Sequence, residues 1–397
     1  MHKALPILRY FLLLLFNPIW YLQLLIPRNK KIWIYGAWYG EKYSDNTKAL
    51  YDYAVNNDKT IRSIWLTRKP TIKDRLTQEG RECFLVWSLK GVLLSLLAKK
   101  VIVCSSKKDV NPYFINGTII VNTWHGCPMK RIGLDDEYNN NSKIKKQIVS
   151  ILFPFICEWN YHNVVSTAPE FSKVMSSSFD IPMNSVLETG YPRNDILYSK
   201  EVAPYNLKLK ETFRNHKLVY YLPTFRTGNG AVSIFNLKDY DEKTFSNFLE
   251  KENIVFVSKA HFVDKVLVGE QSDSLSRIIQ LSDSETLDIN CLMKDADLLI
   301  TDYSGAYFDF LLTEKPILFA AFDLLEYQSK SRKMYFIYEE IISGPIATNW
   351  VAITENLKTL LTENNYASQI KEKKKRFNTF NDSDSSKRLF DEISKLC

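Results

Sequence analysis

The chain has 397 residues, of which 45% are hydrophobic and 24% charged, and its formal net charge is +7. This length is enough for about two domains with large cores. Only 13 Gly and 14 Pro occur beside 8 Trp, 22 Tyr and 23 Phe, which excludes a collagenous or disordered chain. The mild positive charge suits an anionic ligand or membrane surface but proves neither.

The six cysteines form no C-x-x-C pair and have no zinc-type spacing to a histidine. We therefore expect reduced thiols in a cytoplasmic compartment. The sequence contains no helix-turn-helix, zinc-finger or RNP signature, so we expect no nucleic-acid partner.

Residues 1–30 form an apolar segment that we expect to associate with a membrane. Its core, Tyr10 to Ile26, has no charged residue and is flanked by lysines and arginines. Asn17-Pro18 interrupts the stretch, which makes it marginal as a bilayer span, so we expect it to lie in the membrane interface. A buried core helix is the alternative. No small-x-small site follows, which argues against a cleaved signal peptide.

From residue 31 onward, short β-rich runs alternate with helical stretches, which is typical of βαβ units and a parallel sheet. The β-rich runs are residues 31–36, 61–67, 83–87, 101–106, 118–126, 163–169, 185–193, 217–226, 253–262, 277–283, 297–305 and 316–322. The charged segment from Lys200 to Lys217 contains Pro204 and is interpreted as a linker. We therefore predict an α/β fold with an N-terminal domain over 31–205 and a C-terminal domain over 206–397.

Ligands of open α/β sheets bind beyond the carboxyl ends of the strands, so the residues that follow each apolar run are the candidates for chemistry. His125 comes directly after such a run, in NTWHGCPMK, and can accept a proton from an attacking hydroxyl near neutral pH. Considered alone, it could equally be a structural histidine at a strand end.

Cationic residues follow two later strands. Arg226 ends one run, and Lys259 and His261 end the next. Together these side chains could neutralise a phosphate or pyrophosphate. Arg226 alone would also fit a surface ion pair.

Two turns carry further polar residues. In the turn after Ile300, Asp302 and Ser304 precede a helical stretch, where hydroxyls and backbone N–H groups can hold an anion or simply cap the helix. The turn at Gly190 carries Arg193 and Asn194.

Five ordered blocks together resemble the CDP-glycerol glycerophosphotransferase family of teichoic-acid and capsule polymer enzymes. The similarity extends to DNTKALYDY at residues 45–53 and to PILFAAFDLLEY and SGP, so it covers roughly residues 33–350. The five blocks are NTWHGCPMK, ETGYPRNDIL, YLPTFR, KAHF and ITDYSGAYFDFL.

This resemblance implies a GT-B-like fold, in which two Rossmann-like domains face a central cleft, with the acceptor side N-terminal and the CDP-donor side C-terminal. It also implies a peripheral, monotopic enzyme at the cytoplasmic face of the cell membrane. The implied reaction transfers a polyol phosphate from CDP-glycerol or CDP-ribitol to a hydroxyl of a lipid-linked glycan or polyol-phosphate acceptor, releasing CMP. The product would be a teichoic acid or capsular polymer.

The resemblance also implies roles for individual residues. His125 looks like the general base, and His261, with Arg226, looks like a ligand of the pyrophosphate. Asp302, Ser304 and Gly305 would contact the donor's phosphates or polyol. The remaining candidates are Thr224 and Lys259 on the donor side, and Trp124, Gly126, Arg193 and Asn194 on the acceptor or cleft side. A divalent metal such as Mg²⁺ is compatible with this chemistry, but no carboxylate cluster in the sequence indicates a site for it.

The chain departs from the family pattern at three positions: Cys127 stands where Thr is frequent, Gly305 replaces a serine, and Phe262 replaces a proline. The first two leave the proposed base and phosphate ligands in place but bear on the choice of donor and acceptor. CDP-ribitol as donor, a nucleotide-sugar glycosyltransferase and a binding protein without catalysis stay open as alternatives. Whether the enzyme adds one unit or many also stays open.

Overall fold

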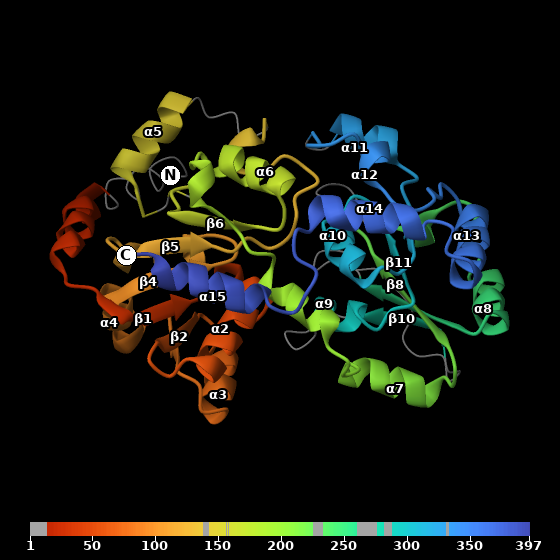
Figure 1. Ribbon diagram of the computed structural model, residues 1–397, viewed down its shortest axis with the longest axis horizontal. Coiled ribbons are helices and arrows are strands. Elements are labelled where there is room, and N and C mark those ends of the chain that lie inside the picture. The colour runs from red at the N-terminus through yellow and green to blue at the C-terminus, as the bar shows by residue number, and fades with distance from the viewer. Residues whose placement is uncertain are drawn as a thin grey trace, which may run out of the picture. The chain divides into compact units, whose positions relative to one another are not determined.

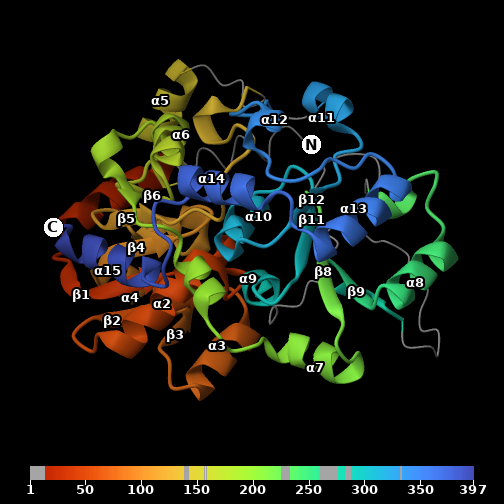
Figure 2. The same ribbon diagram turned by 45° about the vertical axis from the view of Figure 1, so that its right-hand side comes forward.

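The computed structural model describes residues 14–137, 143–155, 157, 159–224, 233–259, 276–281, 288–330 and 333–397. Its contacts divide the chain into two compact units, each with one β-sheet flanked by helices (Figures 1 and 2). The first unit comprises residues 1–125, 132–193 and 384–397, and the second comprises residues 126–131 and 194–383.

The first unit contains a parallel sheet with the strand order β3-β2-β1-β4-β5-β6-β7. Its strands are β1 (Asn29–Tyr35), β2 (Arg62–Thr67), β3 (Cys83–Leu85), β4 (Ala98–Val103), β5 (Ile119–Asn122), β6 (Asn163–Ser166) and β7 (Val186–Glu188). The longer helices of this unit are α2 (Asp45–Asn57), α3 (Pro70–Gln78), α4 (Leu89–Leu97), α5 (Lys143–Leu152), α6 (Pro169–Phe179) and α15 (Ser385–Lys395).

The second unit contains a parallel sheet with the order β10-β9-β8-β11-β12. Its strands are β8 (Lys217–Leu222), β9 (Ile254–Lys259), β10 (Ile278–Leu281), β11 (Leu298–Thr301) and β12 (Ile317–Phe319). Its α-helices are α7 (Pro204–Thr212), α8 (Glu242–Lys251), α9 (Ile289–Met293), α10 (Ala306–Phe310), α11 (Leu324–Lys330), α12 (Tyr338–Ile341), α13 (Trp350–Thr362) and α14 (Ala367–Phe377).

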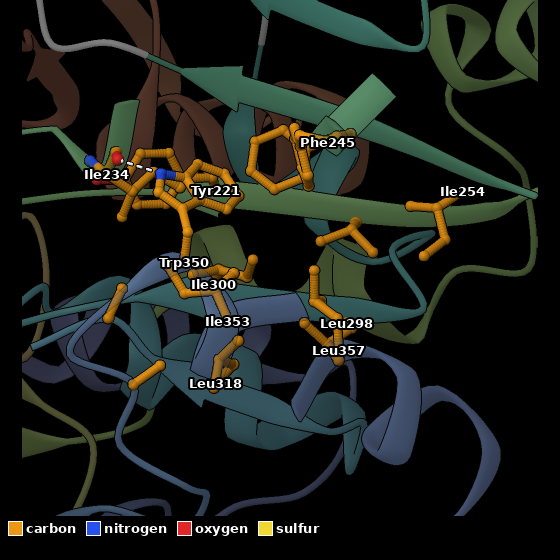
Figure 3. Close-up of a cluster of buried hydrophobic side chains, with 14 of the residues drawn as sticks. Tyr221, Ile234, Phe245, Ile254, Leu298, Ile300, Leu318, Trp350, Ile353 and Leu357 are labelled. Carbon is orange, nitrogen blue, oxygen red and sulfur yellow. Dashed lines mark hydrogen bonds between the residues drawn. The ribbon is translucent and has the colours of Figure 1, made fainter. Parts of the chain in front are cut away.

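Helices bury both faces of these sheets, so the central strands are apolar almost without interruption. The core on one side of the second sheet shows the packing (Figure 3). Trp350 of α13 packs on Phe245 of α8, with 4.5 Å between ring centroids, and its Nε1 donates to the carbonyl of Ile234 at 2.6 Å. Since each β-rich run of the sequence overlaps one strand, the prediction of an α/β fold with parallel sheets is confirmed.

The segment interpreted as a linker, Lys200 to Lys217, instead contains helix α7 of the second unit. Pro204 occupies the first turn, where its fixed φ favours a helix start. Asn206 anchors the helix because its Nδ2 donates to the Leu292 carbonyl at 3.0 Å and its Oδ1 accepts from Tyr220 Oη at 2.7 Å. The division between the units accordingly falls after Arg193 rather than near residue 205.

The last residues also differ from the predicted division, because residues 384–397 belong to the first unit. Nζ of Lys100 donates to the carbonyls of Ile393 and Ser394 at 2.5 and 3.2 Å, which satisfies the carboxyl end of α15. Phe390 of the same helix packs on Trp33 with 5.1 Å between ring centroids. A lysine within a strand therefore fixes the position of α15.

The N-terminal apolar segment is helical over residues 14–22 and continues as the 3-10 turn η1 (Gln23–Leu25). One side is buried: Phe16 contacts Tyr113 and Phe155 edge-on, and Trp20 also packs on Phe155. The other side leaves Leu15, Ile19 and Leu22 more than half exposed. Within the part of the chain that the structure describes, which omits residues 1–13, no helix is long and apolar enough to cross a membrane.

Candidate functional site

The loop that follows β5 carries His125 at the carboxyl edge of the first sheet. Asn122 is buried, and its Oδ1 accepts from the backbone N–H of Trp124 at 2.8 Å. Trp124 has φ 53° and Gly126 has φ 144°, so left-handed backbone precedes and follows the histidine. Residues other than glycine adopt such a conformation only where their surroundings impose it, and such strain clusters at functional sites.

The ring of His125 is held by a main-chain carbonyl and two indoles. Its Nδ1 lies 3.1 Å from the carbonyl oxygen of Cys104. Because a carbonyl can only accept, Nδ1 carries the proton in this arrangement and Nε2 of the neutral imidazole carries the lone pair. The ring centroid lies 4.2 Å from that of Trp124 and 5.0 Å from that of Trp38.

Asp109 fixes the loop that supplies this carbonyl. Its Oδ2 accepts from the N–H groups of Cys104 and Ser105 at 2.8 and 2.7 Å, and its Oδ1 accepts from that of Tyr39 at 2.7 Å. Burial raises the pKa of Asp109 to about 6, while these N–H groups act in the opposite direction. The buried carboxylate thus positions the Cys104 carbonyl and, through it, His125.

Arg193 joins three segments in the same unit. Its Nη1 donates to Oδ1 of Asp45 at 3.0 Å and to the carbonyl of His125 at 2.8 Å. Asn46 accepts from the N–H of Arg193 at 3.1 Å and donates to the carbonyl of Trp124 at 2.9 Å. The structure therefore brings the blocks around residues 45, 125 and 193 together, as a buried network that holds the main chain of the histidine loop.

Polar residues also follow neighbouring strands of the second sheet. After β8, the N–H and Oγ1 of Thr224 donate to Oδ1 of Asp302, which follows β11, at 2.8 and 2.6 Å. Lys259 is the last residue of β9 and is half-buried, and Ser304 accepts from the N–H of Ala306 at 3.3 Å. Within the second unit, the carboxyl edge of the sheet thus carries Thr224, Lys259, Asp302 and Ser304.

Gly305 is required by a close approach of the backbone. A Cβ at this position would lie 2.6 Å from the carbonyl oxygen of Cys127. The Cys127 segment belongs to the second unit and is held there by two backbone hydrogen bonds. The N–H of Tyr335 donates to the carbonyl of Met129 at 3.0 Å, and the N–H of Arg131 donates to the carbonyl of Lys333 at 2.8 Å. Two departures from the family pattern, at residues 127 and 305, therefore meet in space.

Three further site residues were predicted from the sequence: Arg226, His261 and Asn194. Arg226 and His261 lie outside the described residues. Asn194 is buried; its Nδ2 donates to Asp309 at 2.8 Å and its Oδ1 accepts from Asn290 at 2.7 Å, an arrangement typical of a structural residue. Among residues with described positions, no cluster of three or more His, Cys, Asp or Glu could hold a metal ion.

Four residues of this arrangement have no role predicted from the sequence: Asp45, Asn46, Trp38 and Asp109. Asp45 and Asn46 begin the DNTKALYDY block, so the resemblance pointed to the segment without naming a function. Nothing in the local sequence marks Asp109 as a buried acceptor of backbone hydrogen bonds, because its partners come from loops that meet only in the folded chain.

Two units with doubly wound parallel sheets, each carrying polar groups at its carboxyl edge, define the class as an α/β protein of the kind that binds ligands beyond the ends of its strands. The model of the CDP-Glycerol:Poly(glycerophosphate) glycerophosphotransferase family matches residues 19–395, so the chain belongs to this family. It is accordingly a transferase, as predicted.

Similar proteins agree with this membership. The chain is 28% identical to a teichoic acid glycerol-phosphate transferase of Staphylococcus aureus, over 92% of this chain and 94% of the relative. It is 29% identical to a teichoic acid poly(glycerol phosphate) polymerase of Bacillus spizizenii, over 81% and 82% of the two chains. The solved structure of the wall teichoic acid polymerase TagF, soaked with CDPG, has the same fold, with a TM-score of 0.75 and 23% identity over 93% of this chain and 89% of that chain.

Proposed function

We propose that the enzyme transfers glycerol phosphate from CDP-glycerol to a hydroxyl of a lipid-linked acceptor and releases CMP, at the cytoplasmic face of the membrane, in the synthesis of a teichoic acid or related surface polymer. Membership of the glycerophosphotransferase family supports this reaction. The names of the relatives that match most of the chain also support it.

The relatives favour CDP-glycerol over CDP-ribitol as the donor. Those matched over 92% and 81% of this chain are named for glycerol phosphate. The ribitol-phosphate polymerases TarK and TarL of Staphylococcus aureus match over 46% of this chain. We therefore keep CDP-ribitol as the competing donor in the experiment below.

The hydrogen bond between His125 and the Cys104 carbonyl is the observation that carries the mechanism. It leaves the lone pair on Nε2, which suits a general base. In the proposed step, Nε2 of His125 removes the proton of the acceptor hydroxyl as its oxygen bonds to the β-phosphorus of CDP-glycerol. The bond from that phosphorus to the bridging oxygen breaks, and its electron pair leaves with CMP.

The donor side is proposed to lie at the carboxyl edge of the second sheet. Lys259 and Ser304 would contact the phosphates, together with Arg226, His261 and the backbone at Gly305. Phosphoryl transfer depends mainly on positioning and charge neutralisation, which cations and hydroxyls can supply. The GT-B-like arrangement, with the first unit on the acceptor side and the second on the donor side, is part of this proposal.

Exposed apolar residues of the first unit support attachment to the membrane. The N-terminal helix exposes Leu15, Ile19 and Leu22. It is joined to α5, which exposes Ile148 and Ile151, because Asn17 Nδ2 donates to the Leu152 carbonyl at 2.6 Å. Through Tyr113, which contacts both Phe16 and Trp87, it also adjoins the start of α4, where Trp87, Leu89 and Leu93 are exposed. Exposed apolar side chains on three neighbouring elements suit an interaction surface.

Sedimentation with vesicles tests this surface. The double variant Ile19→Glu, Leu22→Glu should lose binding to phosphatidylcholine vesicles, because two carboxylates would have to enter the interface. The matched control Leu325→Glu replaces an exposed apolar residue of the second unit and should bind like the unaltered protein. Equal binding by all three proteins would contradict the membrane surface.

Mass spectrometry of the lipid-linked product tests the transfer. With CDP-glycerol the acceptor should gain one or more glycerol phosphate units, with one CMP released for each unit. Addition from CDP-ribitol alone would replace the proposed donor, and turnover of a UDP-sugar alone would replace the proposed class.

A further inference from the structure

A cavity of about 630 Å³ lies in the first unit, apart from the residues around His125. Residues 115–120, before and at the start of β5, and residues 160–162, before β6, form much of its wall. The N-terminal helix and η1 contribute Trp20, Tyr21 and Leu24. The volume is in the range of small-molecule sites.

The cavity is lined by three basic side chains, Lys99, Lys107 and His162. Lys107 is the most buried, with 4% of its surface exposed. Its Nζ donates to the carbonyl of Pro154, and this hydrogen bond is long at 3.4 Å. No Asp or Glu side chain is among the described lining residues, but Cys397, the last residue of the sequence, lines the cavity as well. A buried ammonium group is costly unless an anion pairs with it.

The two lysines also affect the pKa of His162. Its pKa is lowered, first by burial and then by the charges of Lys107 and Lys99. Its Nδ1 accepts from the backbone N–H of Ile120 at 3.0 Å, so the ring is held as the neutral tautomer with a proton on Nε2. The cavity thus offers two ammonium groups and an N–H donor.

We propose that this cavity binds the phosphate group of an anionic membrane phospholipid. The choice of a lipid follows from the apolar side of the cavity. Tyr21 and Leu24 line it and are also about half exposed on the helix that carries Leu15, Ile19 and Leu22. A phospholipid whose phosphate group lies in the cavity would therefore have its acyl chains beside an apolar surface. A free phosphate would contact only the basic side of the cavity.

This inference rests on the membrane attachment proposed above, but its site is separate from the transfer reaction. The test therefore measures binding without turnover. The probe is dihexanoyl-phosphatidylglycerol below its micelle concentration, titrated into the full-length protein by calorimetry. Because the probe is monomeric, its binding does not include the general attraction between a basic protein and an anionic bilayer.

Lys107→Met should weaken the binding of this lipid at least tenfold, because a charge-assisted hydrogen bond to the phosphate is lost. The matched control Lys30→Met removes an exposed lysine of the same unit and should bind within about twofold of the unaltered protein. If Lys107→Met does not fold, Lys99→Met serves as the second variant, with the same expectation of weaker binding. Equal binding by the pocket variants and Lys30→Met overturns the proposal.

Two further titrations identify the source of the phosphate. Glycerol phosphate, which lacks acyl chains, should bind at least tenfold more weakly than the lipid; equal affinity would make the ligand a free phosphate and overturn the lipid assignment. His125→Ala should bind the lipid like the unaltered protein. Failure of the transfer reaction would then appear only in CMP release, and failure of the cavity only in calorimetry.

Discussion

The carbonyl oxygen of Cys104 lies 3.1 Å from Nδ1 of His125 and thereby decides which nitrogen of the ring carries the lone pair. The carbonyl has this position because Asp109 gathers the N–H groups of Cys104 and Ser105 on one buried carboxylate oxygen. The geometry of the proposed base thus depends on a residue that does not touch it.

Asp109→Asn is expected to lower kcat of CMP release about tenfold or more while changing KM little. The amide can accept through only one oxygen, so one set of N–H groups loses its partner and the Cys104 carbonyl shifts. Steady-state kinetics with CDP-glycerol, together with a thermal melt, gives the measurement. A loss of stability with kcat unchanged would show that Asp109 has no part in positioning His125.

Breaking the buried pair of Arg193 and Asp45 should destabilise the first unit. Their side chains are only 12% and 7% exposed, and removing one partner strands the other charge, at a cost of about 3–5 kcal/mol. Urea denaturation of Asp45→Asn measures this change. In the exposed pair of Arg62 and Glu82, at 48% and 41%, Glu82→Gln should cost less than about 1 kcal/mol. Similar losses in both variants would contradict the role given to Arg193.

Gly305→Ser restores the residue that is frequent in the family, yet it should destabilise this protein. The new Cβ would lie 2.6 Å from the Cys127 carbonyl, and overpacking of this kind costs about 1–3 kcal/mol. Differential scanning calorimetry measures the shift in Tm. An unchanged Tm would mean that the Cys127 segment yields easily and that the close approach does not explain Gly305.

Lys107 should make stability depend on pH in alkaline solution. Burial lowers its pKa from 10.5 to about 8, and the thiol of Cys157 acts in the opposite direction. The pKa of Lys107 is lower in the folded protein than in the unfolded chain, so burial of the charged group opposes folding. This unfavourable contribution is fully present below pH 8 and declines as the pH rises from 8 to 10.5. The relief amounts to about 3 kcal/mol.

Lys107→Met removes the titrating group, so the difference in unfolding free energy between this variant and the unaltered protein should shrink over that pH range. Lys99, His162 and Cys397 also line the cavity and are present in both proteins. His162, whose pKa is lowered from 6.5, is neutral throughout this pH range. A difference that stays constant from pH 8 to 10.5 would contradict a buried ammonium at this position.

The strands and the histidine loop could be predicted from the sequence because both depend on local pattern. Runs such as residues 218–222 are buried on both faces, as a covered parallel strand must be, and His125 directly follows another such run. Prediction and structure differ where tertiary contacts determine the conformation of a segment. Lys200 to Lys217 looks like a linker by composition, yet Asn206 holds it against the second unit as a helix.

Side-chain partners were equally beyond the sequence. Arg193 was a candidate for the acceptor side, but nothing local shows that Asp45, 148 residues away, would pair with it. The docking of α15 depends on Lys100, a charged residue inside a strand that local reasoning would place near solvent. Long-range hydrogen bonds of this kind require the folded chain.

The most direct test of the account is CMP release by the purified protein with CDP-glycerol and a lipid-linked acceptor analogue, compared with His125→Ala. General base catalysis contributes about 10²- to 10⁴-fold, so the variant should lose at least a hundredfold in rate while its calorimetric affinity for CDP-glycerol stays within about threefold. Release by His125→Ala at the rate of the unaltered protein would contradict the proposed role of His125 and with it the mechanism.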